Sequence, residues 1–89
     1  MGYRHKEASQ LSRQISALVI KLRKEAKVKQ IGFADKLSVT ISAYAPVELG
    51  YKEWHMYKIQ KLCDIFGLTI SEFFCQVQSI EPVKTRHSK

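Results

Sequence analysis

Apolar residues recur three or four positions apart through the first third of the chain, which is the spacing of one face of an α-helix. The series consists of Ala8, Leu11, Ile15, Leu18, Val19, Leu22 and Ala26. This pattern predicts a first helix over residues 8–26. The basic residues of its last turns lie mostly away from the apolar stripe, where they suit the helix dipole or form a solvated face. They are Lys21, Arg23, Lys24 and Lys27.

The next segment predicts two shorter helices joined by a tight turn. A second helix is expected over residues 30–37, with apolar residues on one side. Those residues are Ile31, Ala34 and Leu37. Thr40 is a suitable N-cap for a third helix, because its hydroxyl can accept a hydrogen bond from a free amide of the next turn. The third helix is expected over residues 41–49, and Gly50 ends it.

Helical spacing of apolar residues returns in the second half of the chain. It predicts a fourth helix over residues 55–66, and Gly67 is well placed just past its end. A fifth helix is expected over residues 70–78, and Pro82 lies beyond it. Its candidate N-caps are Thr69 and Ser71, with Glu72 in the first turn. Residues 81–89 read as a loose basic tail.

Pro46 lies inside the third predicted helix. A proline within a helix removes a backbone donor and clashes with the carbonyl four residues earlier, which here belongs to Ser42. The helix is therefore expected to be interrupted at Pro46, either as a kinked or shortened helix or by a new turn that begins there. Proline is well tolerated as the first residue of a helix, so both geometries stay open.

The charge balance of the chain favours an anionic partner. The 89 residues include 15 Lys and Arg against 8 Asp and Glu, for a formal net charge of +7. Nucleic acid and an acidic membrane surface are the partner classes that such a charge suits. Net charge also keeps small proteins soluble, so charge alone does not decide the partner.

The remaining side chains offer little chemistry for catalysis. Cys63 and Cys75 each lie among apolar residues, which predicts buried, reduced thiols. The histidines, His5, His55 and His87, are scattered, and no Cys or His spacing matches a metal site. No enzyme activity, metal, cofactor or small-molecule substrate is therefore expected. No apolar run is long enough to span a membrane, and we expect a cytoplasmic protein.

Two runs of sequence together resemble the lambda-repressor-like helix-turn-helix family, also called the XRE or Cro type. They are LRKEAKVKQIGFADKLSVTISAYAPVELG and KIQKLCDIFGLTISEFF, and the resemblance extends from Leu22 to Phe74. The matching features are LRKE, the Gln30 side chain, FADKLSV, the Glu48 and Gly50 pair, and FGLTISEFF. The resemblance implies an all-α, compact five-helix DNA-binding domain over residues 1–80, with the helix-turn-helix at helices two and three.

The resemblance also implies how such a domain meets DNA. The family places its third helix in the major groove. Ile41, Ser42 and Ala45 would then face the base edges, and Gln30 would hold a phosphate at the start of the second helix. The other residues expected at the DNA are Lys29, Thr40, Tyr51 and Lys52. The position of Ile41 is often a glutamine in this family, so base reading here would depend on methyl contacts and on Ser42.

The C-terminal part of the domain suggests a dimer. The fifth predicted helix is short and carries more large apolar residues than it can bury in its own core. The expected dimer interface consists of Phe73, Phe74, Val77 and Ile80. Two-fold dimers of this kind pair with two DNA half-sites.

Two functions therefore follow from the sequence. The first is a sequence-specific transcription regulator of a bacterium, phage or mobile element, bound as a homodimer to double-stranded operator DNA. The alternative is a protein-interaction module, such as an antitoxin-like or co-regulator partner, that keeps the fold and has weak or lost DNA reading. The apolar character of Ile41, Tyr44, Pro46 and Leu49 favours the alternative, although Tyr44 can equally belong to the core.

Overall fold

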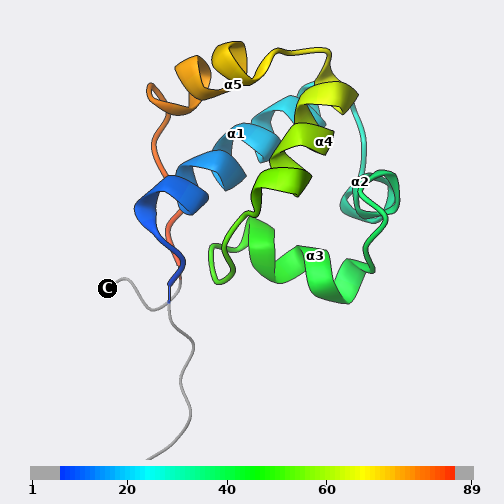
Figure 1. The fold of residues 1–89 in the computed structure, drawn as a ribbon. Helices are drawn as coiled ribbons and strands as arrows, with labels where there is room; N and C mark the ends of the chain where they lie inside the picture. Colours follow the sequence, from blue (N-terminus) through cyan, green and yellow to red (C-terminus); the bar gives the residue numbers. More distant parts are fainter. Residues whose placement is uncertain (1–6, 86–89) are drawn as a thin grey trace, which may run out of the picture.

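The computed structural model describes residues 7–85, which fold into five α-helices (Figure 1). They are α1 (Gln10–Glu25), α2 (Gln30–Lys36), α3 (Ile41–Glu48), α4 (Met56–Phe66) and α5 (Ile70–Val77). The helix α1 packs against both α3 and α5, while α2 packs against α3 and α4 against α5. In Figure 1, α5 and α3 lie on opposite sides of α1, with α4 between them. The predicted all-α, five-helix class is confirmed.

All five helices lie where the periodicity predicts them, with ends that differ by one or two residues. The largest difference is at the start of α1. The apolar stripe includes Ala8, which is buried, but Ala8 precedes the helix. Ser9 is the N-cap, with its side chain accepting a hydrogen bond from the Ser12 amide at 3.1 Å. A buried apolar residue just before a cap thus extends the stripe without extending the helix.

The caps of the later helices agree with the sequence. Thr40 caps α3 by accepting from the Ala43 amide at 3.2 Å. Thr69 and Glu72 form a capping box at the start of α5, with reciprocal hydrogen bonds of 3.0 and 2.8 Å. Each cap satisfies backbone donors that a helix start leaves without partners. Gly67 adopts the left-handed conformation just past α4, with φ of 68°.

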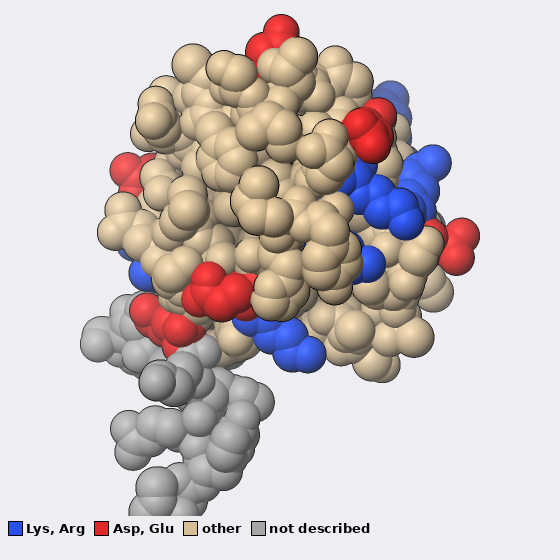
Figure 2. All heavy atoms as spheres, viewed as in Figure 1, with Lys and Arg blue, Asp and Glu red and all other residues tan. Residues whose placement is uncertain are grey.

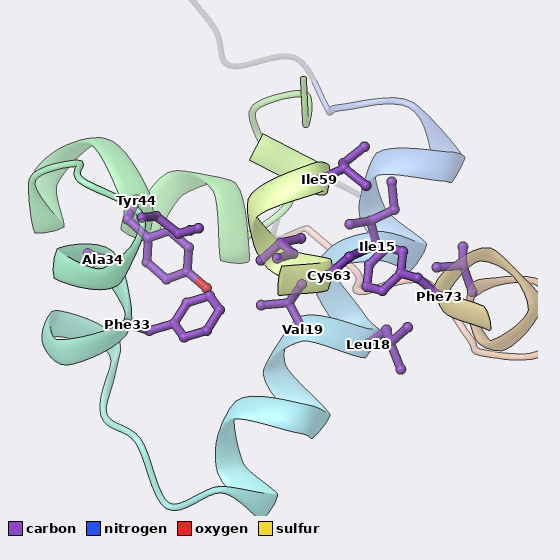
Figure 3. Packing of buried hydrophobic residues seen from close by; sticks show 12 residues of the cluster. Ile15, Leu18, Val19, Phe33, Ala34, Tyr44, Ile59, Cys63 and Phe73 are labelled. Atoms are coloured by element: carbon purple, nitrogen blue, oxygen red, sulfur yellow. The ribbon is translucent and has the colours of Figure 1, made fainter. Parts of the chain in front are cut away.

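The hydrophobic core draws on all five helices (Figure 3). Phe33 of α2 lies 5.8 Å from Tyr44 of α3 between ring centroids, and it stacks on Phe66 of α4 at 5.5 Å. Trp54, in the loop before α4, meets Tyr44 edge-on at 6.4 Å. The aromatic rings therefore fix α2, α3 and α4 against one another, since each buries a large apolar surface in a specific geometry.

Pro46 lies inside α3, which continues from Ile41 to Glu48. The helix then ends in a motif closed by Gly50, whose φ is 92°. The Gly50 amide donates to the Val47 carbonyl at 3.2 Å, and the Tyr51 amide donates to the Pro46 carbonyl at 3.0 Å. The proline therefore neither ends the helix nor opens a separate turn, since α3 continues past it to Glu48. The helix is short because its end is set at Gly50.

The N-cap serine of α1 and two serines within the helix hold the loop between α3 and α4. The Glu53 carboxylate accepts hydrogen bonds from the Ser9 amide at 2.6 Å, the Ser9 hydroxyl at 2.8 Å and the Ser12 hydroxyl at 2.6 Å. The Ser16 hydroxyl donates to the Val47 carbonyl at 2.7 Å and accepts from the Trp54 indole at 2.9 Å. The loop that follows α3 is thus attached to the N-terminal half of α1.

The segment after α5 corrects one expectation from the sequence. Residues 81–85 were expected to belong to a loose tail, but the Val83 amide donates to the Arg13 carbonyl at 3.1 Å. Thr85 is buried, and its hydroxyl donates to the Glu7 carboxylate at 2.8 Å. This segment also covers Gly50, where an added Cβ would lie 3.0 Å from Thr85 and 3.1 Å from Val83. The folded domain therefore reaches Thr85, and the rest of the expected tail lies outside the described residues.

The cysteines differ from each other in exposure. Cys63 is buried in the core, and burial raises the pKa of its thiol. Cys75 is exposed on α5, which corrects the expectation that both thiols are buried. Its neighbours on α5 at the buried face are Phe73 and Val77, so Cys75 falls on the opposite side of that helix.

We expect Pro46→Ala to raise the free energy of unfolding by roughly 1–3 kcal/mol, because alanine restores a helical donor for the Ser42 carbonyl and removes the ring clash. Urea unfolding of parent and variant measures this difference. Pro82→Ala is a matched control outside the helices, and a loss of about 0.4–1 kcal/mol is expected there. A destabilised Pro46→Ala would contradict the account of α3.

We expect the stabilising effect of Glu53 to depend on pH. Hydrogen bonds from Ser12 and Ser9 hold the pKa of the Glu53 carboxyl below its ordinary value of 4.5. A lowered folded-state pKa contributes stability that is present above the unfolded pKa and lost as the pH falls through the folded one. Glu53→Gln should therefore cost roughly 1 kcal/mol at pH 7, and the difference should shrink below about pH 4. A pH-independent difference in thermal unfolding would count against this role.

Candidate nucleic-acid interface

One side of α3 faces solvent and the other is buried. Tyr44 and Glu48 point inward, with 2% and 4% of their surfaces exposed. Ser42 is exposed at the start of the helix, and Ala45 is partly exposed one turn later. Ile41 is half-buried and packs against the edge of the core. Of the three residues predicted to face bases, Ser42 is therefore the most accessible.

The buried side of α3 is held by the carboxylate of Glu48. The Arg23 guanidinium of α1 binds the Glu48 carboxylate in a bidentate manner, with Nε donating at 2.8 Å and Nη2 donating at 3.0 Å. The side-chain amide of Gln30, in α2, donates to the same carboxylate at 2.8 Å, and the Tyr44 hydroxyl also donates to it. The third guanidinium nitrogen of Arg23 donates to the Val28 carbonyl at 2.8 Å. A buried ion pair with its remaining polar groups satisfied is the arrangement that tolerates burial.

The environment of Tyr44 fixes its protonation state. Burial of the ring and hydroxyl is the main cause of a raised pKa, and the hydrogen bond to the negatively charged Glu48 raises it further. The phenol therefore stays protonated and remains a donor at all physiological pH values. This donor lies within α3 itself and satisfies the buried Glu48 carboxylate, while Arg23 and Gln30 bind the same carboxylate from α1 and α2.

The first turn of α2 runs beside α3. Lys29 is the N-cap residue of α2 and is exposed, without a side-chain hydrogen bond at the cap. Gln30, expected to hold a phosphate, is occupied in part by its hydrogen bond to Glu48. At the N-terminus of α3, Thr40 and Ile41 line a shallow hollow together with Ile31 from the first turn of α2. The starts of α2 and α3, which carry most of the residues expected at the DNA, therefore lie next to each other.

The loop after α3 carries the other two predicted contacts. Tyr51 is partly exposed and Lys52 is exposed. Lys52 lines a largely apolar hollow of about 380 Å³ together with Ala43 and Val47 of α3 and Trp54. These residues belong to a different side of α3 from Ser42 and Ala45. The loop therefore lies beside Ala43 and Val47 of α3 and leaves Ser42 uncovered.

Two further basic residues near α3 were not predicted from the sequence. Lys58 of α4 donates to the Leu37 carbonyl at 2.8 Å, and Lys61 donates to the Ser38 hydroxyl at 3.2 Å. Both lie beside the turn that leads into α3. Their three-residue spacing places them on one face of α4, and this spacing was the signal in the sequence. Figure 2 shows a face that is mostly uncharged, with Lys and Arg mainly at its right and lower edges.

The structure corrects two of the four residues expected at the dimer interface. Phe73 and Val77 are 0% and 1% exposed because they complete the core against α1 and α4. Phe74 and Ile80 are partly buried and pack against the same core. The expectation that α5 cannot bury its apolar residues was wrong, since neighbouring helices cover them. Phe73 and Val77 are therefore unavailable to a partner in this fold.

Neither a candidate metal site nor a membrane-spanning helix occurs in the part of the chain that the structure describes. Residues 7–85 contain no group of His, Cys, Asp and Glu side chains that could hold a metal ion. Over the same residues, none of the helices combines the length and the apolar character needed to cross a membrane.

Comparisons with known proteins identify the fold. No protein-family model matches the chain, and no curated protein matches it at a significant level. Among solved structures, the crystal structure of the clp gene regulator ClgR from C. glutamicum is similar, with a TM-score of 0.70 and 17% sequence identity. The match covers 88% of this chain and 99% of that one. The fold is a helix-turn-helix domain. The fold implied by the resemblance to the lambda-repressor-like family is thereby confirmed.

The buried ion pair was missed although both of its members lie in the quoted motifs. Arg23 follows Val19 by four positions, so it falls on the apolar stripe of the first helix. Glu48 is the single charged residue of the predicted third helix. A lone charge on each of two apolar helix faces is a signal for a buried pair, because an isolated buried charge is too costly to persist.

We expect Glu48→Gln to lower the free energy of unfolding by about 3 kcal/mol or more, because it leaves the Arg23 guanidinium buried without its counter-charge. Tyr44→Phe removes one donor and should cost about 1–3 kcal/mol. Glu25→Gln, at an exposed position near the end of α1, is the control and should change stability by less than about 0.5 kcal/mol. Urea unfolding measures all three. Equal small effects at Glu48 and Glu25 would show that the pair does not hold α3.

Proposed function

We propose that this protein is a sequence-specific DNA-binding transcription regulator that places α3 in the major groove. The observation that carries the proposal is the accessibility of Ser42 on a helix whose opposite side is locked to α1 and α2 through Glu48. A rigid helix with one open side suits groove reading, because the contacting side chains are held in register. The similarity in fold to the clp gene regulator ClgR supports it.

The proposed roles divide between phosphate and base contacts. Lys29, Gln30, Thr40, Tyr51 and Lys52 would contact the DNA backbone, which supplies affinity that depends on salt. The base edges would be met from Ile41, Ser42 and Ala45 on α3. Lys29 is exposed at the start of α2, and Lys52 is exposed in the loop that follows α3. Both would be available to DNA phosphates on either side of the base contacts from α3.

We propose further that two copies bind two half-sites. One α3 contacts only a few base pairs, whereas paired modules separated by about 34 Å along the DNA give useful selectivity. The interface cannot include Phe73 or Val77. Phe74 and Ile80 retain some exposure and remain candidates for it. Light scattering on the protein–DNA complex tests this, and one copy on one half-site would contradict it.

The alternative is a protein-interaction module that has kept the fold. Four large apolar residues favour it by their exposure, since apolar surface often marks a partner site. They are Ile31 at 65%, Leu49 at 54%, Met56 at 63% and Tyr57 at 68%. This reading predicts DNA binding without sequence preference, at a Kd of about 10⁻⁴–10⁻⁶ M at physiological salt.

Selection of bound DNA from a random pool, repeated at two salt concentrations, distinguishes the two functions. The regulator predicts one enriched motif at both concentrations. The interaction module predicts no enriched motif, and its affinity for DNA should decrease as the salt concentration rises.

We expect Lys52→Gln to weaken binding uniformly across sequences and to reduce the salt slope by about 1, because the lysine would neutralise one phosphate. Ser42→Ala should instead relax specificity at one or two base positions by roughly 1–3 kcal/mol with the salt slope unchanged. Lys21→Gln provides the charge-matched control, since Lys21 lies beside Gln76 and Ser79, on the side of α1 that faces α5. Titrations of selected and scrambled DNA at several salt concentrations separate these effects. An altered motif for Lys52→Gln would contradict its backbone role.

A further inference from the structure

Four residues at the surface of α3 and its C-terminal end form one continuous strip. Ser42, Ala45, Pro46 and Leu49 follow each other at spacings of three, one and three residues. On an ideal helix these positions fall within an arc of roughly 100°. We call them the exposed stripe of α3. The buried Tyr44 and Glu48 lie outside this arc. Within it, Ser42 and Leu49 are exposed, and Ala45 and Pro46 are partly exposed.

The exposed stripe is almost wholly apolar. Ser42 supplies its only side-chain hydroxyl, and Leu49 is 54% exposed at the end of the helix. From Ile41 to Leu49 there is no Arg, Lys, Asn or Gln. Those four residue types make the paired hydrogen bonds that distinguish guanine and adenine in the major groove. The stripe therefore cannot read purines in the usual way.

The major groove has one apolar feature that such a surface can recognise. Thymine projects its C5 methyl group into the groove, and contact with small apolar side chains is the recognised way to read it. Cytosine and uracil lack this group, so burial of the methyl discriminates thymine from both. Each buried methyl group improves binding roughly fourfold when it is removed from water.

We propose that the exposed stripe reads the C5 methyl groups of thymines, with Pro46 and Leu49 as specificity-determining residues. This inference rests on the proposed DNA-binding function and adds the class of base that the protein selects. It also assigns a use to the proline. The pyrrolidine ring presents a rigid apolar surface at the middle of the stripe, and it loses no side-chain rotamer freedom on binding. A proline that weakens the helix thus strengthens the surface that meets DNA.

The test uses the DNA site selected from the random pool and the full-length protein. Each thymine in the site is replaced by deoxyuridine, which removes only the methyl group. We expect a loss of affinity of roughly fourfold at each contacted thymine, and about 10-fold to 100-fold when two to three are replaced together. Replacement of thymines in the flanking DNA should have no effect. A uracil site that binds as tightly as the thymine site overturns the proposal.

Variants of the stripe assign the effect to its residues. Leu49→Ala and Pro46→Ala should each bring the thymine-to-uracil affinity ratio closer to one, whereas Ser42→Ala should leave it unchanged. Leu11→Ala is the matched control, because Leu11 is similarly exposed, at 52%, but lies on α1. Thermal unfolding verifies that each variant folds. Leu49→Ala and Pro46→Ala variants that both retain the full ratio overturn the assignment to these two residues.

The outcomes also separate this inference from the proposed function. If a motif is selected but thymine and uracil bind equally well, the proposed regulator function remains supported and only the recognition of methyl groups is refuted. Failure to select any motif overturns both.

Discussion

The carboxylate of Glu48 joins the three helices on which the candidate interface is built. It accepts hydrogen bonds from Arg23 of α1, Gln30 of α2 and Tyr44 of α3. Because these donors come from different elements, the position of each helix depends on the others. A charge at this depth is stable only while all of its partners are present, since a buried charge without its counter-charge costs several kcal/mol. The site therefore requires the helices to assemble together.

This dependence explains how α3 can exist at all. It has eight residues, and α2 has seven, whereas isolated helices shorter than about 12–15 residues are marginal in water. The proline removes one further hydrogen bond from α3. Local propensity is thus insufficient, and tertiary contacts stabilise the helix. Its caps at Thr40 and Gly50, the ring of Tyr44 in the core and the Glu48 carboxylate supply those contacts from the ends and from the buried side.

The sequence predicts features that depend on nearby residues. The five helices follow from apolar spacing, and the caps at Thr40, Gly67 and Thr69 follow from the preferences of single residues for helix ends. The prediction of a break or a new turn at Pro46 was wrong, because the intrinsic penalty of roughly 3 kcal/mol for a proline inside a helix was weighed without the contacts that offset it.

Contacts between distant parts of the chain were not predicted. The carboxylate of Glu53 meets Ser9 and Ser12 across 44 and 41 positions, and Arg23 meets Glu48 across 25. Periodicity places a residue on a face but does not say which other face will cover it. The same limit placed Phe73 and Val77 in the expected dimer interface, whereas both are buried in the core, where α5 packs against α1 and α4.

Gln30 shows how the phosphate and base contacts of the proposed interface can act together. Its amide nitrogen carries two hydrogens and its oxygen is an acceptor, so one hydrogen bond to Glu48 leaves capacity for another partner. A phosphate at the start of α2 would accept the second hydrogen. One side chain would then connect the DNA backbone to the carboxylate that orients α3. The depth and rotation of α3 in the groove would follow from where the phosphate lies. Since apolar contacts are non-directional, a stripe that reads methyl groups gains most from a register that is imposed by such a fixed polar contact.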